Sequence, residues 1–373
     1  MNATIKWIIG IIIVIAIIWI GFSLGDKQPA ETGPIKIGLS APLTGEGTSF
    51  GDGMRAGAQL AVSEINEAGG VDGRMVEVIY EDDTCTARGG STVFNKLVNV
   101  DRVDAIAGPL CSAVGAAGLP IAQEAGVPTI EFGSAPALPA IGDYIFRTYP
   151  SDSFQGKFTA EYLTDELSKK KAAVLYVKND WGQGLSDVFE ASFTELGGEV
   201  VYNEGVAPET KDLKSFIAKI KLAEPDVIYL PAYPNIAIIG LRQMAEAGID
   251  VPIWSGDAFD TDEIVKSGVA DGAVYVRALT ASPDDFKQRI KDETGIDSNL
   301  PTPLTYDAIH ILAKVFGEVG TDKEAVRDAL ASLSYRDAVS LPLIEFDELG
   351  DLTTAEFEIM TIQNGEAVPY VQE

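Results

Sequence analysis

The stretch AAVLYV (Ala172–Val177) decides the fold class, because all six of its residues are apolar. An uninterrupted apolar run of this length is typical of a strand that is covered on both faces. The helical pattern Leu185–Leu196 follows it and ends at Gly197-Gly198, and a second strand pattern begins at Val200. Strand, helix and strand in this order predict a parallel sheet with helices on both sides.

The same alternation runs in two series through the chain, whose 373 residues exceed one average domain. The first series begins at IKIGLS (Ile35–Ser40) and the second near Ser151. We therefore predict an α/β protein with two doubly wound, Rossmann-like lobes. The expected strands are 35–40, 76–80, 105–107, 128–131, 172–177, 200–203, 227–230, 252–254, 341–346 and 355–362, and the expected helices are 53–69, 92–100, 113–125, 153–168, 185–196, 213–222, 236–247, 284–294, 305–317 and 323–333.

The N-terminal segment WIIGIIIVIAIIWIGFSL (Trp7–Leu24) carries no charge over 18 residues. As a helix it is about 27 Å long, close to the hydrocarbon thickness of a bilayer. A buried core helix and a cleaved secretory signal are the alternatives. We favour an uncleaved membrane anchor followed by a polar tether, together residues 1–33. The remaining chain is then expected outside the cytoplasmic membrane, or secreted or periplasmic if the segment is cleaved.

The charge and the cysteines restrict the partners further. A net charge of −28 repels nucleic acid, so no nucleic-acid partner is expected. Cys85 and Cys111 are too few for a structural zinc site, and His310 is the single histidine. On an exported chain a disulfide is the first hypothesis, and two free buried thiols are the alternative.

Sequence motifs of catalysis are missing. The chain has no phosphate-binding G-x-x-x-x-G-K-[ST] loop, no G-x-S-x-G elbow and no G-x-G-x-x-G after its first strand, where Ala41–Gly45 reads APLTG. His310 lies in a helical pattern and is expected to be a surface or packing residue. We therefore expect no enzyme activity, no cofactor and no metal. Ligands of open parallel sheets bind beyond the carboxyl ends of the strands, so the loops after the strands hold the candidate residues.

These loops resemble the type I periplasmic binding proteins, specifically the branched-chain amino acid receptors of ABC transporters. The resemblance covers nearly all of residues 35–373 in order and spacing. It rests on Ala41–Gly57, Asn66–Gly73, Tyr80–Cys85, Gly108–Ser112, Gly126–Leu138, Lys178–Gly184, Leu230–Tyr233, Thr305–Ala308, Phe346-Asp347 and Gly350-Asp351.

The resemblance implies two Rossmann-like lobes joined by a hinge of three crossings. Lobe one would comprise residues 35–150 plus 279–354, and lobe two residues 151–278 plus 355–373. It also implies that Cys85 and Cys111 form a disulfide. The expected function is capture of a small amino-acid-like ligand and its delivery to an ABC transporter permease.

The expected ligand site needs donors for a carboxylate and an anion for an ammonium group. Ser112 and Ser134 follow strands and match the carboxylate-binding loops of the family, and Ser112 also begins a helix. Asp257 matches the acidic residue that pairs with the ammonium group, where the family usually has Glu.

Four further residues match positions around the ligand. Phe132 stands where a backbone carbonyl faces the ammonium group. Phe50, Trp181 and Tyr233 match aromatic positions and are expected in Gly- or Pro-containing loops. Phe50 and Trp181 replace the more frequent Tyr. Two alternatives remain open: a receptor for amides, urea or aromatic acids, which the altered aromatics would suit, and a ligand-sensing ectodomain.

Overall fold

The computed structural model describes residues 33–45 and 47–372. The expected membrane segment Trp7–Leu24 lies outside the described residues. In the described part of the chain, no helix is both long enough and apolar enough to cross a bilayer.

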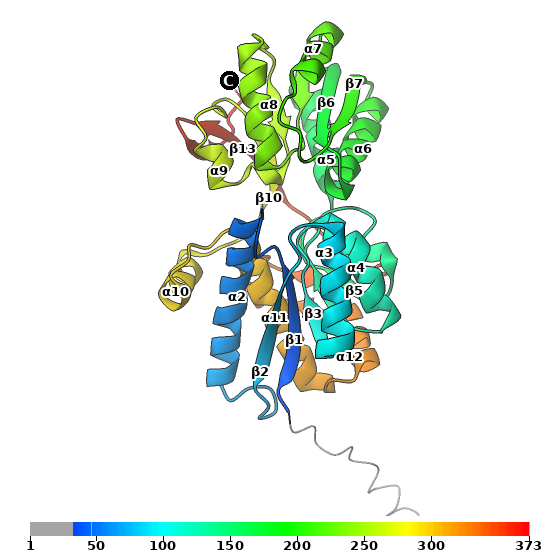
Figure 1. The fold of residues 1–373 in the computed structure, drawn as a ribbon, viewed down its shortest axis with the longest axis vertical. Helices are drawn as coiled ribbons and strands as arrows, with labels where there is room; N and C mark the ends of the chain where they lie inside the picture. The colour runs from blue at the N-terminus through cyan, green and yellow to red at the C-terminus, as the bar shows by residue number, and fades with distance from the viewer. Residues whose placement is uncertain (1–32, 46, 373) are drawn as a thin grey trace, which may run out of the picture. The chain divides into compact units, whose positions relative to one another are not determined.

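The first sheet has five described strands in the order β2-β1-β3-β4-β5, and all neighbouring pairs are parallel. β1 lies between β2 and β3, so the winding direction reverses beside β1, as in a doubly wound sheet. Figure 1 shows β1 and β2 with α2 and α3 packed alongside. The strands are β1 (Ile35–Ala41), β2 (Val76–Asp82), β3 (Ala105–Ala107), β4 (Thr129–Glu131) and β5 (Ile145–Arg147).

Helices from both ends of the chain cover this sheet. α2 packs against α11, and α3 packs against α4. Glycine permits the first approach, because a Cβ on Gly57 of α2 would lie 2.2 Å from the carbonyl oxygen of Thr302 in α11. The helices are α2 (Thr48–Glu67), α3 (Ala87–Asn95), η1 (Lys96–Asp101), α4 (Ser112–Glu124), η2 (Pro139–Ile141), α10 (Asp284–Thr294), α11 (Pro301–Val319) and α12 (Lys323–Ala331).

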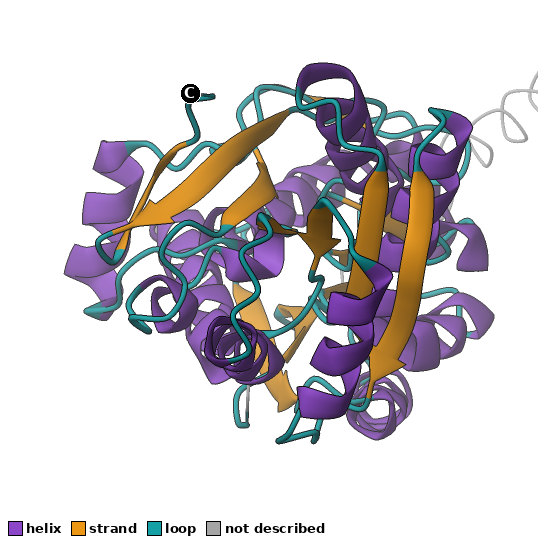
Figure 2. Cartoon of the chain, turned by 90° about the horizontal axis from the view of Figure 1, so that it is seen from above, coloured by secondary structure: helices purple, strands orange, loops and turns teal. Residues whose placement is uncertain are grey.

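The second sheet has seven described strands in the order β14-β13-β10-β9-β8-β6-β7. The strands from β10 to β7 are parallel, whereas β13 and β14 are antiparallel additions at the edge. Figure 2 shows helices on both sides of the strands. The strands are β6 (Lys171–Val177), β7 (Glu199–Val206), β8 (Val227–Tyr229), β9 (Ile253–Ser255), β10 (Val274–Ala278), β13 (Phe357–Gln363) and β14 (Glu366–Pro369), and the helices are α5 (Asp152–Glu161), η3 (Tyr162–Glu166), α6 (Asp180–Glu195), α7 (Lys214–Ala223), α8 (Pro234–Glu246), η4 (Asp257–Phe259) and α9 (Asp262–Val265).

The predicted fold class is confirmed, but some element bounds differ. The expected strand Leu341–Phe346 is reduced to β12 (Ile344–Glu345), which pairs with β11 (Ser334–Tyr335). Pro342 explains the reduction, because proline has no N–H to donate to a neighbouring strand.

Four helices begin about one turn earlier than predicted, and these are α2 at Thr48, α3 at Ala87, α6 at Asp180 and α11 at Pro301. In α6 the Asn179 side chain caps the first turn by accepting a 2.9 Å hydrogen bond from the N–H of Gly182. The first turn of α6 was not predicted because its glycines interrupt the apolar periodicity that indicates a helix.

Candidate functional site

All seven predicted ligand-binding residues follow the carboxyl end of a parallel strand. Phe50 follows β1, Ser112 follows β3, Phe132 and Ser134 follow β4, Trp181 follows β6, Tyr233 follows β8 and Asp257 follows β9. The expectation that the three aromatic residues lie in loops is wrong for two of them. Phe50 and Trp181 belong to the first turns of α2 and α6, and Tyr233 is the N-cap of α8.

The two serines follow neighbouring strands of the first sheet, β3 and β4. Both side chains are buried. The Ser112 hydroxyl accepts a 3.2 Å hydrogen bond from the N–H of Ala135, which joins the start of α4 to the loop after β4. Because Ser112 is the first residue of the 13-residue α4, its hydroxyl lies beside backbone N–H groups at a helix N-terminus, which favour an anion.

A disulfide fixes the start of α4. Cys85 and Cys111 are bonded, with their Cα atoms 5.4 Å apart, so the predicted pairing is confirmed. Cys111 is the N-cap of α4 and directly precedes Ser112. Cys85 lies in the turn after β2, so the bond ties this turn to the helix that carries Ser112.

Asp257 begins η4 and is buried at the other side of the candidate site. Its Oδ2 accepts a 2.5 Å hydrogen bond from the hydroxyl of Tyr149, which follows β5 in the first sheet. Burial raises the pKa of Asp257, and the Tyr149 hydrogen bond lowers it. Burial, and then the charge of Asp257, raise the pKa of Tyr149 well above its usual value. The phenol therefore stays protonated and donates the hydrogen bond to Asp257.

The structure brings two of the predicted aromatic residues together. The rings of Trp181 and Tyr233 stack with centroids 4.7 Å apart and planes inclined by 11°. Phe132, in contrast, has a buried side chain that belongs to the core of the first sheet, together with Ile130. Phe50 is half-buried, and among the described residues no ring contact or hydrogen bond joins it to the other six.

Sequence reasoning missed Asp152, the first residue of α5. Its side chain is fully buried, yet neither carboxylate oxygen has a hydrogen-bond partner in the described part of the chain. Its N–H donates a 2.8 Å hydrogen bond to the carbonyl oxygen of Ser134. Burial and the charge of Asp257 raise the pKa of Asp152 well above its usual value, while the nearby Ser134 and Arg147 lower it.

A buried ion pair lies beside these acids. Arg147 of β5 binds Asp351 through two hydrogen bonds of 2.9 and 2.5 Å. Its Nε lies 3.9 Å from Glu131, whose pKa burial raises to about 8 despite the opposing effect of Arg147. The Arg147 guanidinium therefore pairs chiefly with Asp351, and Glu131 holds a proton at neutral pH.

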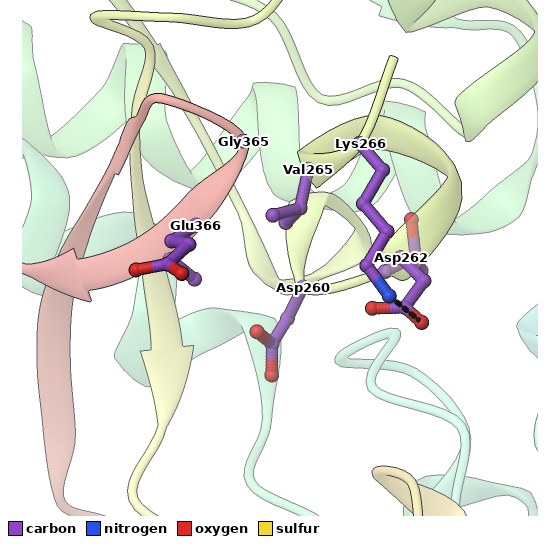
Figure 3. A pocket seen from close by; sticks show the side chains of 8 residues that line it. Asp260, Asp262, Val265, Lys266, Gly365 and Glu366 are labelled. Carbon is purple, nitrogen blue, oxygen red and sulfur yellow. Dashed lines mark hydrogen bonds and ion pairs between the residues drawn. The ribbon is translucent and has the colours of Figure 1, made fainter. Parts of the chain in front are cut away.

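A separate cavity of about 290 Å³ lies beside α9 and the β13–β14 turn, with Asp260, Asp262, Lys266 and Glu366 on its wall (Figure 3). None of the seven predicted residues lines it. Asp260 is already bound to Arg277 at 2.9 Å, and Lys266 to Asp262 at 2.7 Å. Among residues 33–45 and 47–372, no cluster of three His, Cys, Asp or Glu side chains is placed to hold a metal ion.

Comparisons with known proteins show the family and agree with the fold. A family model described as periplasmic binding protein matches residues 34–366. The chain belongs to the periplasmic binding protein family.

This periplasmic binding protein is 32% identical over 339 residues to the leucine-, isoleucine-, valine-, threonine- and alanine-binding protein of Pseudomonas aeruginosa, covering 87% of this chain and 89% of the relative. Among solved structures it is similar to the branched-chain amino acid substrate-binding protein LivJ of Streptococcus pneumoniae in complex with isoleucine. That match has 28% identity and a TM-score of 0.80, and it covers 90% of this chain and 97% of LivJ.

A solute-binding protein of R. palustris in complex with benzoate has a TM-score of 0.79 at 23% identity, covering 90% of this chain and 95% of that one. At this identity the likeness concerns the fold. The relatives of this periplasmic binding protein are thus solute-binding proteins, in line with the predicted family.

Proposed function

We propose that this periplasmic binding protein is a non-enzymatic receptor for a small amino acid, which it captures outside the cytoplasmic membrane for an ABC transporter permease. In this proposal the amino acid's carboxylate binds Ser112, Ser134 and the N-terminus of α4. Asp257 and the carbonyl of Phe132 bind its ammonium group, and Phe50, Trp181 and Tyr233 enclose its side chain.

One chain of contacts carries this proposal, because it joins the hydroxyl side of the site to the acid side. The Ser112 hydroxyl accepts a hydrogen bond from the N–H of Ala135, the carbonyl of neighbouring Ser134 accepts one from the N–H of Asp152, and the charge of Asp257 acts on Asp152. An amino acid carries its opposite charges within a few ångströms of each other, so hydroxyl donors and acids that are linked by such a chain of contacts suit it.

We further propose that the two sheets form two lobes, residues 35–150 plus 279–354 and residues 151–278 plus 355–373. Ligand would bind the serine loops first, and the second lobe would then bring Asp257, Trp181 and Tyr233 over it. Segment Trp7–Leu24 would anchor the receptor in the membrane, and fractionation of the full chain against a form that begins at residue 33 tests this point.

Titration calorimetry on the full-length chain in mild detergent tests the ligand. We expect one or more of leucine, isoleucine, valine, threonine and alanine to bind stoichiometrically without turnover. Asp257→Ala is expected to weaken binding by about 100-fold and Ser112→Ala by about tenfold, because each removes a partner of a buried charged group. Unchanged affinity in both variants would show that the assigned site is wrong. The exposed Asp262→Ala of neighbouring α9 is the control.

A further inference from the structure

Buried acceptor oxygens without donors gather where α5 meets η4. Both carboxylate oxygens of Asp152 and the Oε1 of Gln155 lack hydrogen-bond partners among the described residues. Gln155 packs against Gly256, the residue before Asp257, because a Cβ on Gly256 would lie 2.5 Å from that same Oε1. A group of acceptors without donors calls for a ligand or water that donates several hydrogen bonds.

The charges of this region do not balance within the protein. The charge of Arg147 lowers the pKa of Asp152, but the two hydrogen bonds that Arg147 donates to a carboxylate go to Asp351. Within residues 33–45 and 47–372, the neutral hydroxyl of Tyr149 is the only side-chain group that donates a hydrogen bond to Asp257. Ionising both of two buried carboxylates that have no cation of their own costs a large free energy of desolvation and repulsion, so at least one of them retains a proton.

Building on the proposed function, we propose that Asp152 and Asp257 together retain one proton in the ligand-free protein and exchange it for the ammonium group of the ligand. The proton leaves to the solvent buffer as the ammonium arrives, so the summed charge of the two acids and the ammonium group equals that of the singly protonated pair. No covalent bond to the ligand forms or breaks. Asp152 thus becomes a second acidic ligand-binding residue beside Asp257.

The groups that face the pair support a shared proton. Those around Asp152 and Asp257 are Arg147 from β5, Tyr149 after it, Ser134 from the loop after β4, Tyr229 from β8, Tyr233 at the start of α8 and Asp260 after η4. Burial is the largest cause that raises the pKa of each acid, and the charge of Asp257 raises that of Asp152 further. An ammonium group between them reverses this effect, since it favours the charged carboxylates.

Calorimetry with L-leucine, L-isoleucine and L-alanine, each titrated in phosphate and in Tris at pH 7, tests the exchange. We expect the tightest binder to release close to one proton, seen as a difference in binding enthalpy between the buffers. Its affinity should rise by up to about tenfold per pH unit from pH 5 while the pair retains its proton. Asp152→Asn should abolish most of the release and weaken binding by about tenfold or more.

Glu161→Gln, which makes the same charge change at the exposed end of α5, is the matched control and should behave as wild type. Thermal unfolding verifies that Asp152→Asn is folded, and Asp257→Asn serves as a second variant. Binding without proton release, or equal release from Asp152→Asn, overturns the exchange but leaves the proposed receptor function intact. Absence of binding by every amino acid overturns both.

Discussion

The hydroxyl of Tyr149 lies 2.5 Å from the Oδ2 of Asp257, although the two residues are 108 positions apart in sequence. Tyr149 follows the last strand of the first sheet, whereas Asp257 follows β9 of the second. The hydrogen bond therefore links the two sheets at the acid that we assign to the ligand's ammonium group. It also holds that carboxylate in place before a ligand arrives.

Tyr149→Phe should weaken amino acid binding by about tenfold at pH 7. The variant removes the bond that lowers the pKa of Asp257, so this acid keeps a proton to higher pH and binds a cation less well. The loss of affinity relative to wild type should become smaller as the pH rises from 6 to 9, which calorimetry across this range measures. Tyr202→Phe, which also removes a Tyr–carboxylate hydrogen bond but on β7, should not alter affinity. A deficit that is independent of pH would contradict this mechanism.

Trp181→Leu should lower affinity for the tightest-binding amino acid by about tenfold, chiefly through faster dissociation. The change removes the ring that stacks on Tyr233 and part of the proposed aromatic cover. Stopped-flow fluorescence or surface plasmon resonance gives the dissociation rate. Phe193→Leu disrupts another stacked pair, with Phe189, and should reduce thermal stability while leaving affinity unchanged. Equal affinity losses in both variants would mean that Trp181 acts only through folding.

The unfolding free energy should fall as the pH rises from about 5 to 8, and Glu131 is one cause. Its pKa is about 8 in the folded chain but near the ordinary value of 4.5 in the unfolded chain. Between these values the folded state binds the proton and the unfolded state does not, so stability is lost as the pH rises. Urea unfolding at four pH values measures the slope, which should be flatter in Glu131→Gln. A slope unchanged by that substitution would rule Glu131 out as a cause.

Loss of the disulfide should cost on the order of 3 kcal/mol of stability and also weaken ligand binding. The bond closes a loop over a sequence separation of 26 and holds the residue next to Ser112. Guanidinium unfolding of the Cys85→Ser, Cys111→Ser double variant checks the first effect, and calorimetry checks the second. If stability falls but affinity is retained, the bond does not position Ser112.

The sequence predicted the fold well because its strands are continuous apolar runs, such as Ala172–Val177, between helices with clear periodicity. It also predicted which loops follow the strands, so every candidate side chain was placed at a strand end. Tyr149 and Asp152 were missed because they lie on the segment that crosses between the sheets, where no periodic pattern applies. Their roles arise from the hydrogen bond between Tyr149 and Asp257 and from the effect of the Asp257 charge on Asp152, which only the folded chain creates. The seven site assignments themselves stay predictions until ligand binding is measured.

The antiparallel pairing of β13 with β10 has a consequence for biosynthesis. β6 and β8 are translated early, but the edge of β10 stays open until residues 357–363 have left the ribosome. An open strand edge is a template for pairing with other chains. Completion of the second sheet must therefore wait for the last part of the nascent polypeptide, and a chaperone that shields this edge would protect the chain while it is still being made.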